Sequence, residues 1–77
     1  MDLLDIAIGK WVRITSIHGG AGVDLKLHSL GLMPGDLVRV KRQAPFGGPV
    51  LLEVNGREIA LGRGIAGKIE VEETSVL

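Results

Sequence analysis

Histidine is the residue type in this chain best suited to metal binding or acid–base catalysis, and its spacing offers little to either. His18 and His28 are the only histidines among 77 residues, and the chain has no cysteine. Metal sites gather three or four His, Cys, Asp or Glu side chains at short, fixed spacings. Here only Asp24, one helical turn before His28, shares a helix side with a histidine. We therefore expect no cofactor and no metal ligands, and at most weak binding of a transition metal such as iron or zinc.

Two glutamates form the other pair of chemically capable side chains. Glu53 and Glu58 face each other across an expected hairpin, whose outer face is solvated, whereas acid–base catalysis needs carboxylates in a water-poor cleft with separated pKa values. No serine–histidine–aspartate pattern of a hydrolase is present. Residues 62–67 spell G-x-G-x-x-G, but too little chain follows them for a dinucleotide-binding unit. We therefore expect no catalytic residues and no enzymatic activity.

Positive charge gathers on one expected strand, in Arg39, Lys41 and Arg42, with Lys10 and Arg13 on the strand expected beside it. Small barrels that bind nucleic acids add stacking aromatic side chains to such a patch. This chain has one Trp, one Phe and no Tyr, and its formal net charge is zero. We expect no binding to nucleic acid, and we interpret Arg39 and Lys41 as charges that orient a protein partner.

Two apolar side chains complete the set of candidate partner-binding residues. Leu25 falls on the side of an expected helix opposite its apolar face, near the basic strand. Phe46 sits in a turn-rich loop, where it is either a lid on the barrel end or an exposed anchor. A small domain needs its large apolar groups in the core, which favours the lid. The candidate partner-binding residues are thus Leu25, Arg39, Lys41 and Phe46.

The elements that position these residues are short and separated by glycine turns. Alternating apolar residues predict strands over residues 10–17, 37–42 and 68–71. Asn55-Gly56 predicts a hairpin over residues 50–61, with Leu52 opposite Ile59. A helix is expected over residues 23–30, ended by Gly31 in a left-handed conformation and followed by a type II turn at Pro34-Gly35.

Two single helical turns and a frayed tail are expected outside these elements. Asp5 is expected to cap one helical turn over residues 6–8, and residues 62–67 to form a single helical turn. About residues 73–77 are expected to fray. Together these elements predict a mainly β fold, a small barrel of about five strands with one short α-helix, in a single domain over residues 1–77. No apolar run is long enough to span a bilayer, so we expect a cytoplasmic protein.

Three motifs in order along the chain resemble the ferrous iron transport protein A (FeoA) family. They are L-G-L-M-P-G at residues 30–35, A-P-F-G-G-P at residues 44–49 and I-A-L at residues 59–61. The resemblance covers nearly the whole chain and implies an SH3-like barrel that is not an enzyme. It also implies a cytoplasmic accessory to a ferrous iron permease with a GTP-hydrolysing cytosolic domain, associated with the membrane only through that partner.

The resemblance leaves one alternative function open. The same fold, by resemblance, occurs as the C-terminal domain of iron-dependent repressors, so a metal-linked regulatory domain that works with a DNA-binding regulator is the second hypothesis. The family supplies no agreed catalytic residues to carry over. Transition-metal binding is part of its description, but this sequence shows no ligand cluster for it.

Overall fold

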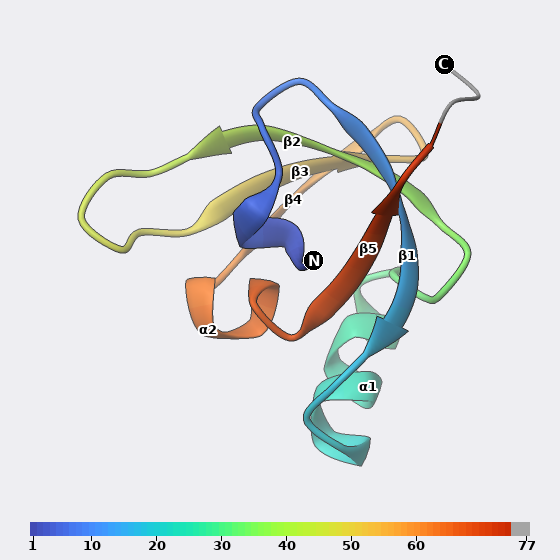
Figure 1. Ribbon diagram of the computed structural model, residues 1–77. Helices are drawn as coiled ribbons and strands as arrows, with labels where there is room; N and C mark the ends of the chain where they lie inside the picture. Colours follow the sequence, from blue (N-terminus) through green and yellow to red (C-terminus); the bar gives the residue numbers. More distant parts are fainter. Residues whose placement is uncertain (75–77) are drawn as a thin grey trace.

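Five antiparallel strands curl around one apolar core, with the longest helix at one end (Figure 1). The computed structural model describes residues 1–74. The sheet order is β4-β3-β2-β1-β5. The mainly β fold expected from the sequence is confirmed. Its elements are η1 (Leu3–Asp5), β1 (Trp11–Ile17), α1 (Ala21–Ser29), β2 (Leu37–Gln43), β3 (Val50–Val54), β4 (Arg57–Leu61), α2 (Arg63–Ala66) and β5 (Ile69–Glu73).

The β3–β4 hairpin has the register that its turn residues predict. Asn55 and Gly56 have φ angles of 51° and 77°, both left-handed, as a two-residue type I′ turn requires. Leu52 therefore lies opposite Ile59, and Glu53 opposite Glu58. The apolar member of each alternating pair turns inward, which places one face of the hairpin in the core.

The end of α1 is fixed by the backbone as expected. Gly31 has φ 82°, its N–H donates to the carbonyl of His28 at 2.9 Å, and the N–H of Leu32 donates to Leu27 at 2.9 Å. These two bonds form a Schellman motif, which returns the fully buried Leu32 to the core beside Leu27. Gly35, at φ 99°, then completes the turn into β2. The helix is thereby held at one end of the barrel.

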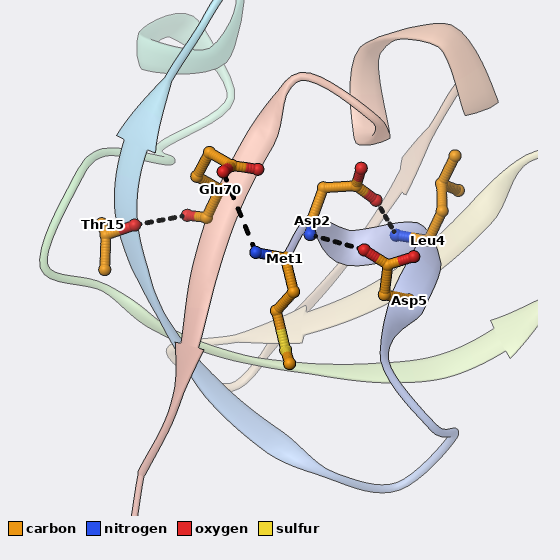
Figure 2. A network of polar contacts seen from close by, with 6 residues as sticks. All are labelled: Met1, Asp2, Leu4, Asp5, Thr15 and Glu70. Carbon is orange, nitrogen blue, oxygen red and sulfur yellow. Dashed lines mark hydrogen bonds and ion pairs between the residues drawn. The ribbon is translucent and has the colours of Figure 1, made fainter.

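The N-terminal segment corrects one expectation. The first helical turn is a 3-10 turn over Leu3–Asp5 capped by Asp2, not a turn over residues 6–8 capped by Asp5 (Figure 2). Asp2 accepts the Leu4 N–H at 2.8 Å, and Asp5 accepts the Asp2 N–H at 2.9 Å. Leu3 is fully buried, so the chain must turn early to bring that side chain into the core.

The last strand is longer than expected. β5 continues to Glu73, which pairs with Val12, so the prediction of a frayed tail from residue 73 is wrong at that position. β1 is seven residues long and offers a pairing edge over this whole stretch, and Lys10 forms an ion pair with Glu73 at 2.6 Å. Residue 74 follows β5, and residues 75–77 of the predicted tail lie outside the described residues. No helix in residues 1–74 is long and apolar enough to cross a membrane.

Candidate protein-interaction site

An open groove runs between α1 and the strand ends beside it, which we call the α1 groove. It has a volume of about 370 Å³ and is lined by the end of β1, one side of α1 and the α1–β2 junction. A shallower hollow on the other side of Asp24 and His28 is lined by Ala21 and Leu25. The residues of the α1 groove are Thr15, Ser16, Ile17, Asp24, His28, Leu32, Met33 and Pro34.

Two large apolar side chains border this region without joining the core. Leu25 is 73% exposed and Met33 is 48% exposed. The orientation of Leu25 follows from Leu27, which is fully buried, because residues two apart on a helix point to nearly opposite sides. The helical phase predicted from the sequence, with Leu25 outward, is therefore confirmed.

The titratable side chains of the α1 groove are Asp24 and His28. Within residues 1–74 no three His, Cys, Asp or Glu side chains are grouped so that they could hold a metal ion. One carboxylate and one imidazole leave at least two positions of a tetrahedral zinc site unfilled. Weak metal binding at this pair stays a prediction.

The outer face of the sheet carries a row of charges that neutralise one another. Arg39 lies opposite Trp11 on one side and Glu53 on the other. Its guanidinium is 5.2 Å from the centre of the Trp11 ring and pairs with the Glu53 carboxylate. Lys41 pairs with Glu58 at 2.6 Å. Two like charges opposite each other repel, and here two cations offset the repulsion between Glu53 and Glu58. Arg39 and Lys41 therefore do not form a free basic strip.

Phe46 is wholly exposed, with a relative accessibility of 104%, so its interpretation as a lid on the barrel is wrong. The β2–β3 loop closes on itself, since the Ala44 N–H donates to the carbonyl of Pro49 at 3.0 Å. That closure leaves the tip of the loop outside the barrel, where it projects away from the sheet (Figure 1).

The candidate residues therefore occupy three separate places. Leu25 lies on α1 and Phe46 in the β2–β3 loop, at opposite ends of the molecule, while Arg39 and Lys41 lie on β2 between them (Figure 1). Sequence reasoning did not identify Met33 and His28 as parts of one groove. The signal was the L-G-L-M-P-G junction, whose tight turn brings Met33 back beside α1.

The strand order, the helix inserted after β1 and the single turn of α2 before the last strand define a small SH3-like barrel. The chain belongs to the FeoA family, because the model of the FeoA domain matches residues 1–73. A Methanocaldococcus jannaschii protein named "Putative Fe(2+) transport protein A" is 38% identical over 65 residues, which cover 84% of this chain and 77% of that protein. The resemblance found in the three sequence motifs is confirmed.

Solved structures agree in fold. A crystal structure of an iron uptake regulatory protein, FeoA, superposes with a TM-score of 0.83 at 32% identity over 92% of both chains. The solution structure of FeoA from Chlorobium tepidum gives a TM-score of 0.87 at 31% identity, over 97% of this chain and 71% of that one. A manganese-dependent transcriptional repressor gives 0.88 at 19% identity over 96% of this chain and 41% of that one, which is a likeness of fold alone.

Proposed function

We propose that this protein is a cytoplasmic, non-enzymatic accessory of ferrous iron uptake that acts by binding the cytosolic domain of a GTP-hydrolysing iron permease. Its family and the name of its Methanocaldococcus relative support a role in ferrous iron transport. In this proposal the protein reaches the membrane only through the permease.

The observation that carries the proposal is the pair of exposed apolar side chains beside the α1 groove. Leu25 buries little of its surface in the fold and Met33 only about half, so each adds less to stability than a core residue does. Apolar anchors beside a groove, rimmed by polar groups such as Asp24 and His28, are typical of protein docking sites. The groove is rigidly placed, because the Schellman motif and the following turn fix α1 against β2.

The experiment is a binding measurement between the full chain and the isolated cytosolic domain of the permease from the same organism, with and without GTP and Fe²⁺. We expect Leu25→Asp to weaken binding by about 1–3 kcal/mol, since a charge replaces an apolar anchor. Ser29→Asp is the matched control, because it adds the same carboxylate to an exposed position of α1 outside both hollows. Absence of wild-type binding under every nucleotide and iron condition would refute the proposal.

The alternative, a metal-linked domain that works with a DNA-binding regulator, rests on weaker support. The likeness to the manganese-dependent repressor is at 19% identity, which speaks for the fold alone. The α1 groove is compatible with either partner, but the family match favours the transporter.

A further inference from the structure

Two tight turns of the same type in this chain carry very different residues. The β3–β4 turn holds Asn55 and Gly56 at φ 51° and 77°. The tip of the β2–β3 loop holds Phe46 and Gly47 at φ 59° and 75°, and the Gly48 N–H donates to the carbonyl of Pro45 at 3.2 Å. Two successive left-handed residues closed by such a bond make a type I′ turn. Phe46 therefore occupies the position that Asn55 occupies in the other turn.

Phenylalanine is poorly suited to that position. Asn, Asp and Gly dominate the first central residue of a type I′ turn, and a bulky residue with positive φ is a conformational outlier. Elsewhere in a protein, burial of the ring could compensate for the strain, but the Phe46 side chain is fully exposed. Because this backbone strain is not offset by any stabilising contact of the ring within the fold, it indicates that the ring contacts another molecule.

The backbone of the loop that carries Phe46 is held in a defined conformation. Pro45 and Pro49 restrict the backbone on both sides, and the Ala44–Pro49 hydrogen bond closes the base. Gly48 packs so closely that a Cβ atom there would lie 2.6 Å from the Ala44 Cβ. A loop backbone held in this way loses little conformational entropy on binding, which is the property of a preorganised anchor.

The charges at the base of the loop indicate the chemistry of the partner. Arg42 is exposed and forms no ion pair within residues 1–74. In the same part of the chain, Arg63 also forms no ion pair, and it donates to the Gln43 side chain at 3.4 Å. The nearby Lys41 is already neutralised by Glu58. The surface around the exposed ring thus keeps positive charge that carboxylates on a partner would complement.

We propose that Phe46 is an anchor that inserts into an apolar pocket with an acidic rim on a partner protein. The identification of that protein as the permease rests on the proposed function. The chemistry of the pocket is inferred independently, from the exposed ring and the charges beside it. A protein pocket suits the loop better than a lipid surface, because surface-bound segments present a broad apolar face rather than one exposed ring on a constrained loop.

The first test exchanges the residues of the two turns. Phe46→Asn should raise the melting temperature of the free domain, because the turn gains its preferred residue and no burial is lost. Asn55→Phe should lower it, since the same strain is introduced into the β3–β4 turn. If Phe46→Asn lowers the melting temperature instead, the ring contributes to the fold and the inference is wrong.

The second test measures binding to the cytosolic domain of the permease. Phe46→Asn should raise the dissociation constant at least tenfold, and Arg42→Glu should slow association several-fold at low salt. Lys68→Glu, between α2 and β5, makes the same charge change at an exposed position that lies outside the β2–β3 loop and both hollows beside α1, so it serves as the control. Wild-type binding that is unchanged in Phe46→Asn would overturn the inference and leave the proposed function intact.

If the permease does not bind, a photocrosslinking phenylalanine analogue tests the Phe46 anchor separately from the proposed function. Placed at position 46 in cells of the source organism, it should crosslink to an apolar pocket flanked by Asp or Glu, whereas the same analogue at position 55 should not. A crosslink to such a pocket on another protein supports the inference while the proposed function fails; no crosslink specific to position 46 overturns the inference.

Two further outcomes name other occupants and would also overturn it. One is Phe46-dependent sedimentation of the protein with vesicles of phosphatidylglycerol and phosphatidylethanolamine. The other is a dimer in analytical ultracentrifugation that is lost in Phe46→Asn.

Discussion

Gly31 shows how one residue fixes the junction between helix and sheet. Its φ of 82° is strained for any side chain, and a Cβ atom there would lie 2.4 Å from the Arg57 Nη2 atom. That guanidinium also donates to the carbonyl of Leu30 at 3.3 Å, at the negative end of α1. A larger residue at position 31 therefore meets both a backbone and a side-chain obstacle.

We expect Gly31→Val to lower the free energy of unfolding by about 1–2 kcal/mol, because a β-branched residue resists positive φ. Gly22→Ala is the control: Gly22 lies within α1, without positive φ and with open space around it, so alanine should stabilise the domain by about 0.4–1 kcal/mol. Urea unfolding of both variants checks this. Unchanged stability in Gly31→Val would contradict the role of the turn.

At this scale the sequence predicted what depends on neighbouring residues alone. Gly31, Gly35 and the Asn55-Gly56 turn follow from local backbone chemistry, and all have the expected left-handed angles. The cap at Asp2 was missed because it depends on where Leu3 must be buried, which is a property of the tertiary structure. Phe46 was misplaced for the same reason: its hydrophobicity predicted burial, whereas the closure of its own loop prevents it.

Among the elements, η1 joins the N-terminal segment to the edge of the sheet. The Val71 N–H of β5 donates to the carbonyl of Met1 at 2.8 Å, and the Met1 ammonium lies 3.9 Å from the Glu70 carboxylate (Figure 2). The capping box of Asp2 and Asp5 holds the turn that follows. One free edge of the sheet is thereby covered by the chain itself.

Removal of the cap should loosen this edge. We expect Asp2→Ala to cost about 0.5–2 kcal/mol, because the Leu4 N–H loses its acceptor, and Asp2→Asn to cost less, because the amide oxygen can still accept. Chemical denaturation gives the magnitudes, and amide exchange at Val71 reports whether the edge opens. Equal stability of the wild type and Asp2→Ala would mean that the cap contributes nothing.

The charge row across β2, β3 and β4 gives a second prediction at the scale of elements. Glu53 and Arg39 are each about one-third exposed or less, whereas Glu58 and Lys41 are more exposed. Glu53→Gln should therefore destabilise the protein by about 1–3 kcal/mol, since it leaves a partly buried guanidinium without its counter-charge. Glu58→Gln should change stability by less than about 1 kcal/mol. Thermal unfolding of the two variants measures both losses of stability. A larger loss for Glu58→Gln than for Glu53→Gln would contradict the greater importance of the Arg39–Glu53 pair.

The sequence of elements along the chain and the register of the β3–β4 hairpin were more predictable than the lengths of the elements. Alternation and turn residues located all five strands, because each signal is local. The extension of β5 to Glu73 could not be read from that segment alone, since its partner, Val12, lies at the other end of the chain.

At the scale of the whole molecule, the candidate surfaces depend on how distant segments come together. Leu25 was recognised from helical phase, but the α1 groove beside it combines the end of β1, α1 and the turn before β2. The basic patch expected from Arg39 and Lys41 was lost on folding, because the hairpin brings Glu53 and Glu58 next to them. Neither the groove nor the neutralisation of these charges could be predicted from the sequence, because the residues involved lie far apart along the chain.

The metal prediction belongs to the whole molecule, because it depends on ligands that converge from different segments. Residues 1–74 contain no group of three His, Cys, Asp or Glu side chains that could hold a metal ion. We therefore expect Zn²⁺ or Fe²⁺ to bind the isolated domain, at Asp24 and His28, with a dissociation constant of about micromolar or weaker. His28→Ala should abolish whatever binding remains, whereas His18→Ala should not. Stoichiometric, submicromolar binding by calorimetry would contradict this expectation.

Ion pairing on the sheet also changes what Arg39 and Lys41 can contribute to docking. Each sits beside a carboxylate, so its long-range field is largely cancelled by its neighbour. Lys41→Gln leaves the charge of Glu58 without its cation and places no new carboxylate on the sheet. The variant should therefore associate more slowly with a permease surface that is acidic. The effect should appear only at low salt, where charges act beyond their nearest neighbours. Lys10→Gln, which uncovers Glu73 in the same way at the β1–β5 edge, is the matched control. Stopped-flow association rates over a range of salt concentrations compare the two. A larger decrease in the association rate for Lys41→Gln than for Lys10→Gln would place the docking surface on the β2 side of the sheet. Equal decreases would mean that Lys41 contributes only to net charge and is not part of that surface.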